Sequence, residues 1–169
     1  MNPILQSWNE SSEDAAIASL LSCCAAKRWA SAVATQRPFA SEASLYETAD
    51  QVWATMQERD WMEAFRAHPR IGARKPAEAS AQSKAWSSQE QSSVATAQTT
   101  ILAELAQANQ QYEDQFGFTY IVCATGKSAE EMLSILQRRL RNDRETELRE
   151  AAEQQRQITQ IRLRKWLQS

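Results

Sequence analysis

The sequence concentrates its rarest residues in one stretch, Phe-Arg-Ala-His-Pro-Arg-Ile-Gly-Ala-Arg at residues 65–74. This stretch holds the only histidine of the chain, one of its three glycines and one of its four prolines. Because proline disfavours helical backbone at the residue before it, His68 is predicted to lie where a helix stops. Gly72 then permits a tight turn or the close approach of a ligand. The stretch therefore predicts a helix end that presents an imidazole.

A single histidine in such a place has two interpretations. It can cap the end of a helix or lie on the surface there. The helix dipole favours its cationic form, while the neighbouring arginines oppose that charge. It can also serve as an acid or base in a reaction, because its ordinary pKa lies near neutral pH. The sequence around His68 leaves both interpretations open.

The composition predicts an all-α protein. A chain of 169 residues with 43% hydrophobic and 24% charged residues is long enough to bury one sizeable core. So few glycines and prolines favour long helices over a turn-rich β fold. We therefore expect a single-domain multi-helix bundle over residues 1–169, with one short extended buried segment near residues 119–124.

Charge and cysteine content narrow the class of protein. A net charge of −2 provides no general attraction to nucleic acid or to an anionic membrane, and no run of about 18 apolar residues is present to span one. Three cysteines, two of them adjacent, do not make a disulfide framework and suit a reducing compartment. One histidine without a CxxC pair argues against a zinc site. We therefore expect no bound metal. No secretory signal is visible, so we also expect a cytoplasmic protein.

Helix start and stop signals recur along the chain. Ser11 or Ser12, Ser41 and Ser128 are predicted to cap helices, and Gly117 is predicted to end one. Expected helices cover residues 3–8, 27–35, 59–67 and about 87–115. Further helices are expected to begin at residues 11–14, 41 and 128, with buried faces that reach Leu21, Trp53 and Leu140. A last long helix begins or continues at residues 142–143 and runs to about Trp166. We expect residues 69–86 to form an ordered loop.

The run Thr-Tyr-Ile-Val-Cys-Ala at 119–124 is the only β-like segment. No second strand is available to pair with it, so its buried amides and carbonyls must find side chains, water or a ligand. Cys123 has apolar neighbours, which would raise its pKa and make it inert, so a structural role is favoured over a nucleophilic one.

Glu90 is the natural carboxylate partner for His68. Ser87 and Glu90 have the spacing of a capping box, which would make Glu90 a helix-stabilising residue. The alternative is an acid, a base or an orienting carboxylate that reaches the imidazole. Ser87, Ser88 and Gln91 would then add hydrogen-bonding groups for an amide-rich ligand. Arg70 would hold a substrate carboxylate or simply be exposed.

Arginines at 138, 139 and 141 raise the question of nucleic-acid binding. Acidic neighbours reduce the local positive charge, and no aromatic residues are interleaved with the arginines. A mixed-charge helix surface is therefore favoured over nucleic-acid binding. The alternating charges of residues 144–156 likewise predict a solvated helix face.

Several short motifs occur in a fixed order along the chain. They are Arg-Pro-Phe at 37–39, His-Pro-Arg-Ile-Gly at 68–72, Ser-x-x-Glu-Gln at 87–91, Phe-Gly-Phe at 116–118, Arg-Leu-x-Asn at 139–142 and Glu-Leu at 147–148. In this combination, which covers nearly the whole chain, the sequence resembles the 2-oxo-4-hydroxy-4-carboxy-5-ureidoimidazoline (OHCU) decarboxylases. One departure is visible, because relatives often carry a glycine where Ser92 and Ser93 stand here.

The resemblance implies an all-helical, cofactor-free decarboxylase that forms a homodimer and acts on OHCU, a small-molecule substrate. It assigns the catalytic histidine to His68 and the catalytic glutamate to Glu90. The substrate-binding residues that it implies are Pro69, Ser87, Ser88, Gln89, Gln91, Tyr120, Ile121, Val122, Cys123 and Ala124, the last five through their main chain.

Two other function classes remain as alternatives. A helical binding module would keep the apolar stripes and lose His68 or Glu90, both of which are present. A hydrolase acting on a related ureide would need a metal site or an activated nucleophile, and the sequence shows neither.

Overall fold

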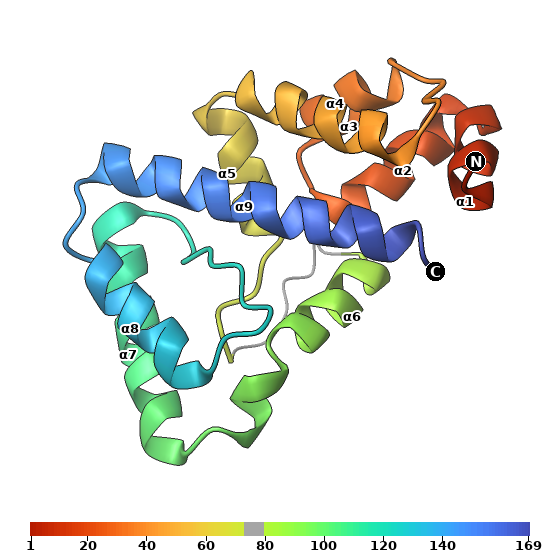
Figure 1. Ribbon diagram of the computed structural model, residues 1–169. Coiled ribbons are helices and arrows are strands. Elements are labelled where there is room, and N and C mark those ends of the chain that lie inside the picture. Colours follow the sequence, from red (N-terminus) through yellow and green to blue (C-terminus); the bar gives the residue numbers. More distant parts are fainter. Residues whose placement is uncertain (73–79) are drawn as a thin grey trace. The chain divides into compact units, whose positions relative to one another are not determined.

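The computed structural model describes residues 1–72 and 80–169, and over these residues the protein is helical without a β-strand (Figure 1). This confirms the all-α prediction. The chain forms two compact units, one of residues Met1–Ala64 with Arg156–Ser169 and the other of residues Phe65–Gln155. No helix among the described residues is long and apolar enough to cross a membrane.

The first unit contains four complete helices and parts of two more. Its helices are α1 (Pro3–Glu10), α2 (Glu13–Cys23), α3 (Lys27–Ala34), α4 (Glu42–Ala54), most of α5 (Glu58–Arg66) and the end of α9 (Arg144–Trp166). The Ser12 and Ser41 side chains cap α2 and α4 as predicted, each accepting a hydrogen bond from a backbone amide of the first turn. The predicted apolar stripe of α4 is buried at Leu45, Ala49, Val52 and Trp53. Helical spacing therefore identified this part of the core correctly.

Arg37 of the Arg-Pro-Phe motif joins the end of α1 to the loop after α3. Its Nη1 donates to the carbonyl oxygens of Trp8 at 2.6 Å and Ser11 at 3.0 Å, and its guanidinium lies 5.2 Å from the Trp8 ring centroid. Trp8 also packs edge-on against Trp166, with the ring centroids 5.6 Å apart. A cation at the last carbonyls of a helix satisfies groups that the helix itself leaves unpaired. The motif therefore has a structural role in this unit.

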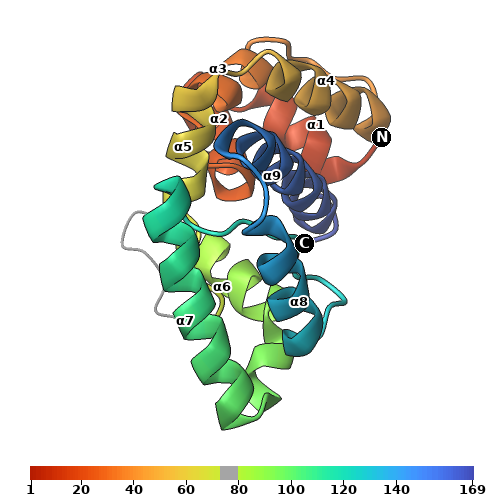
Figure 2. The same ribbon diagram turned by 90° about the vertical axis from the view of Figure 1, so that its left-hand side faces the viewer.

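The second unit contains α6 (Ala81–Glu90), the 3₁₀-helix η1 (Ser92–Thr96), α7 (Thr99–Phe116), α8 (Ala129–Arg139) and the first part of α9. Helices α7 and α8 lie side by side (Figures 1 and 2). Gly117 ends α7 with a φ of 82°, the left-handed conformation predicted for a helix C-cap. Ser128 caps α8 as predicted.

The loop predicted at residues 69–86 is partly wrong. Residues 81–86 are helical, because the Ser80 side chain accepts a hydrogen bond from the Ser83 amide and starts α6 there. Residues 73–79 lie outside the described part of the chain. The single helix predicted over 87–115 is also wrong, since α6 ends at Glu90 and η1 separates it from α7.

A fully buried ion pair between Arg139 and Glu147 joins α8 to α9. Arg139 Nε donates to Glu147 Oε1 at 2.6 Å, and both side chains have no exposed surface. The Tyr112 hydroxyl of α7 also donates to Glu147, and burial raises the pKa of this phenol, which keeps it protonated as a donor. Arg139 Nη1 donates to the Ile121 carbonyl, and its guanidinium lies 4.9 Å from the Tyr120 ring centroid. One charged pair thus holds three helices and the 119–124 segment.

The mixed-charge surface predicted for the arginine cluster is therefore wrong at Arg139, and the solvated face predicted for α9 is wrong at Glu147. Arg139 lies at helical spacing from the buried residues Met132 and Leu136, so it faces inward, whereas the Arg138 side chain is 58% exposed. Charge alternation along a sequence does not reveal which of the charged residues shares the apolar face.

Glu147→Gln should lower the free energy of unfolding by about 3 kcal/mol, because it removes the nearest counter-charge of the buried Arg139 and leaves only the Glu150 carboxylate, 3.9 Å from Arg139 Nε. Urea denaturation of the two proteins measures this difference. The matched control is Glu145→Gln on the same helix, which breaks an exposed pair with Arg149 and should cost less than about 0.5 kcal/mol. Equal small losses in both variants would contradict a buried pair.

Candidate functional site

The predicted catalytic turn lies directly after α5. This helix ends at Arg66, and the His68 amide donates to the Phe65 carbonyl oxygen at 3.0 Å. Pro69 is buried, and Gly72 has a φ of 81°. A Cβ at Gly72 would meet Val94 Cγ1 at 3.3 Å, so both the backbone conformation and the close approach of η1 favour glycine here. The predicted helix end with its imidazole is confirmed.

The His68 imidazole contacts Gln155 of α9. His68 Nε2 lies 2.6 Å from Gln155 Oε1; His68 is partly exposed, whereas Gln155 is fully buried. An amide oxygen only accepts hydrogen bonds, so Nε2 carries the hydrogen in this arrangement. The sequence analysis missed Gln155. Its signal was a polar residue on the same helical face as the buried Ala151 and Ile158.

Arg70 is engaged by α7. Its Nε donates to Glu113 Oε1 at 2.7 Å, its Nη2 pairs with the other oxygen of the same carboxylate, and Nη2 also donates to Gln110 at 3.1 Å. The hydrogen bond to Glu113 raises the pKa of the guanidinium. This arrangement ties the turn to α7, and a role for Arg70 toward a substrate carboxylate stays a prediction.

The predicted capping box at Ser87 and Glu90 is wrong. Ser87 is a buried residue inside α6, and Glu90 is the last residue of that helix rather than part of its first turn. Ser88 and Gln89 are exposed. Ser87 and Glu90 do have the spacing of a capping box, but Ser80 caps the helix and starts it two turns earlier.

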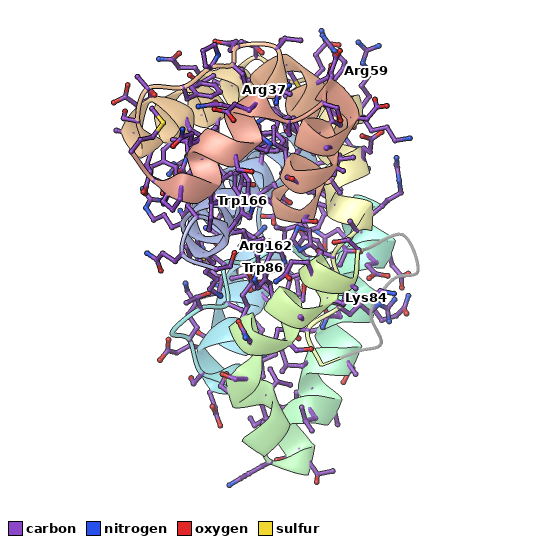
Figure 3. All side chains as sticks on the ribbon, turned by 90° about the vertical axis from the view of Figure 1, so that its right-hand side faces the viewer. Arg37, Arg59, Lys84, Trp86, Arg162 and Trp166 are labelled. Carbon is purple, nitrogen blue, oxygen red and sulfur yellow. The ribbon has the colours of Figure 1, made fainter. Side chains whose placement is uncertain are left out.

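Glu90 therefore lies where helix stability does not favour it. The carboxyl end of a helix carries partial negative charge, so a carboxylate there costs a few tenths of a kcal/mol up to about 1 kcal/mol. Glu90 follows the buried residues Trp86 and Ser87 by four and three positions, which places it on their side of α6. Figure 3 shows Trp86 and Lys84 extending from different sides of this helix.

A backbone contact links the turn to the end of α6. The Gly72 amide donates to Gln91 Oε1 at 3.0 Å, and Gln91 directly follows Glu90. Two of the three predicted site segments are thus joined by a hydrogen bond that involves a predicted binding residue.

The 119–124 segment is extended and buried from Tyr120 to Ala124, as predicted. Side chains satisfy several of its backbone groups: the Cys123 amide donates to Gln154 Oε1 at 2.9 Å, and Lys127 Nζ donates to the Cys123 carbonyl oxygen at 2.7 Å. The Ile121 carbonyl oxygen accepts from Arg139. Cys123 is a buried thiol that forms no disulfide. The prediction that this backbone finds side-chain partners is confirmed for these groups.

Adjacent glutamines of α9 therefore hold two of the predicted site segments. Gln155 contacts the imidazole, and Gln154 accepts from the main chain at Cys123. Among residues 1–72 and 80–169, no group of three or more His, Cys, Asp or Glu side chains is arranged to hold a metal ion.

These features define a class: a helical protein whose one histidine lies just after a helix end and contacts a buried glutamine, and whose neighbouring glutamine holds a buried extended segment. The chain belongs to the OHCU decarboxylase family, whose model matches residues 9–164.

Relatives and a solved structure agree with this membership. A uric acid degradation bifunctional protein of Arabidopsis thaliana is 35% identical over 85% of this chain, but the chain spans only 44% of that relative. The 2-oxo-4-hydroxy-4-carboxy-5-ureidoimidazoline decarboxylase of Amia calva is 31% identical over 82% of this chain and 79% of its own length. A crystal structure of OHCU decarboxylase in the presence of (S)-allantoin has a TM-score of 0.78 and 31% identity, covering 94% of this chain and all of that one.

Glu90→Gln should leave the free energy of unfolding unchanged or raise it by up to about 1 kcal/mol, because it removes a negative charge from the carboxyl end of α6. Urea denaturation measures the effect. Ser80→Ala, which removes the cap at the other end of the same helix, should lower it by about 1 kcal/mol. A loss in Glu90→Gln as large as that in Ser80→Ala would contradict this account of the helix end.

Proposed function

We propose that this protein decarboxylates OHCU to (S)-allantoin in urate degradation. The observation that carries the proposal is the His-Pro-Arg-Ile-Gly turn, with its imidazole held by a buried glutamine and its glycine bonded to the residue after Glu90. Family membership and the match to an OHCU decarboxylase structure support it. The bifunctional relative of Arabidopsis thaliana is longer, and this chain spans 44% of its length.

The substrate itself supplies the chemistry that makes a cofactor unnecessary. Its carboxylate and hydroxyl sit on one ring carbon, next to a ring C=N bond. When the bond to the carboxylate breaks, CO2 leaves and the electron pair moves toward that C=N bond, whose nitrogen takes up a proton. The resulting enol then becomes a carbonyl while the neighbouring ring carbon is protonated. Protonation on one face gives (S)-allantoin.

The proposed roles follow from the residues. His68 contacts the substrate hydroxyl and accepts its proton after decarboxylation, when the enol becomes a carbonyl; Glu90 orients the substrate or imidazole and takes part in proton transfer. Ser87, Ser88, Gln89 and Gln91 at the end of α6, with Pro69 in the turn, would surround the substrate. The main chain of Tyr120 to Ala124 would contact the ureido group and the ring amides, and Arg70 is proposed for the carboxylate if it exchanges Glu113 for substrate.

His68→Ala should abolish the rapid appearance of (S)-allantoin, because no other imidazole exists in the chain. OHCU is generated freshly from urate by urate oxidase and hydroxyisourate hydrolase, and circular dichroism follows the chirality of the product. The wild-type protein should give a fast signal of (S)-allantoin, and a loss of at least about 100-fold is expected on removing an acid–base residue. Arg66→Ala, an exposed residue of the same segment, is the matched control.

The same assay separates the alternatives. Decarboxylation releases CO2 and leaves the ureido group intact, whereas a ureide hydrolase releases ammonia or urea. If the protein adds nothing to the slow, racemic background reaction, it is a binding module with this fold. Full activity in His68→Ala would overturn the catalytic assignment.

The family resemblance also leads us to propose a homodimer that acts in a reducing compartment, the cytoplasm. Cys23, Cys24 and Cys123, all within the described residues, are buried thiols that form no disulfide, in keeping with such a compartment. Sedimentation velocity at micromolar concentration should show a species of about twice the 19.1 kDa chain mass. A single species at the chain mass over this range would contradict the dimer.

A further inference from the structure

We infer that Gln155 is a positioning residue that fixes the tautomer of His68, so that Nδ1 is the nitrogen that exchanges a proton with the substrate. This inference rests on the proposed function for its catalytic consequence. The tautomer itself is a property of the protein alone.

The hydrogen-bond geometry carries the first step. Gln155 Oε1 lies 2.6 Å from His68 Nε2, and an amide oxygen cannot donate. A neutral imidazole has one N–H group and one lone-pair nitrogen, and the hydrogen bond at one nitrogen selects the role of the other. With the hydrogen on Nε2, the basic nitrogen is Nδ1.

Burial and helix position make this hydrogen bond a stable restraint. Gln155 has no exposed surface, so water does not compete for its oxygen, and it belongs to the 23-residue helix α9 (Figure 1). The preceding residue, Gln154, accepts from the Cys123 amide at 2.9 Å. The same turn of one helix therefore sets both the imidazole and the extended segment that is proposed to contact the substrate.

A neutral acceptor suits a base better than a carboxylate would. A carboxylate at this position would favour the imidazolium and leave less of the neutral ring that accepts protons. The amide oxygen orients the ring with less preference for its charged form. Gln155 thus orients the imidazole through an uncharged acceptor.

The proton balance is simple. As the enol hydroxyl of the decarboxylated intermediate gives its proton to Nδ1, the O–H electron pair forms the carbonyl. The C=C pair then takes a proton at the ring carbon from a second donor, for which Glu90 is the candidate. The imidazolium that forms still donates its Nε2 hydrogen to Gln155.

The single histidine makes the tautomer directly measurable. Two-bond proton–nitrogen correlation spectra of uniformly ¹⁵N-labelled protein show only one pair of imidazole nitrogens. We expect Nε2 to be protonated and Nδ1 unprotonated once the ring is neutral. Gln155→Leu should move both nitrogen shifts toward averaged values, whereas Gln155→Glu, which keeps an oxygen acceptor, should preserve the Nε2 tautomer. An Nδ1–H ring in the wild type, or unchanged shifts in Gln155→Leu, would overturn the inference.

Kinetics supply the functional part of the test. Gln155→Leu should lower kcat at least about tenfold and change KM by less than about threefold, as expected when an orienting group acts through the base. Gln154→Leu is the matched neighbour; it should leave the tautomer unchanged and act mainly on KM. An inactive wild type with the Nε2 tautomer would refute the proposed function alone, whereas an active Gln155→Leu with wild-type kcat would refute the positioning role alone.

Discussion

The second unit depends on the buried ion pair between Arg139 and Glu147. Two charges without any exposed surface are costly to remove from water, and they are tolerated only when nearly every donor and acceptor finds a partner. Here the partners come from different elements: the Tyr112 hydroxyl of α7, the Ile121 carbonyl and the Asn142 side chain before α9. Losing any one of these contacts would leave a buried charge or polar group without a partner, which costs free energy. The pair therefore restricts how α7, α8, α9 and the extended segment are arranged.

Helix α9 extends that restraint to the candidate site. Glu147 lies two turns before Gln155 on the same buried side of the helix, so the element that carries the ion pair also carries the acceptor for His68. Gln154 adds the contact to Cys123. The orientation of the imidazole and the path of the extended segment thus share one rigid support. Side chains on a helix hold a site more accurately than side chains on a loop would.

The end of α6 shows how a local motif can mislead. Ser-x-x-Glu at 87–90 has the form of a helix start, and the structure places it at a helix end, where a carboxylate gains nothing from the helix dipole. The helix dipole therefore does not account for a carboxylate at this position. The hydrogen bond from Gly72 to Gln91 places the imidazole turn and this helix end in one unit.

The sequence by itself determined the helical class, most helix starts, the helix end before His68 and the glycine cap at residue 117. These features depend on interactions within a few residues, such as side-chain caps, proline sterics and helical periodicity. Its combined motifs also led to the family. The Ser80 cap is equally local, but the serines at 87 and 88 offer a competing helix start. Only the tertiary structure decided that Arg139 and Glu147 are buried together and that Gln155 holds the imidazole. Gln155 lies 87 positions from His68 in the chain, and no local pattern encodes a hydrogen bond between residues that meet only when distant helices pack.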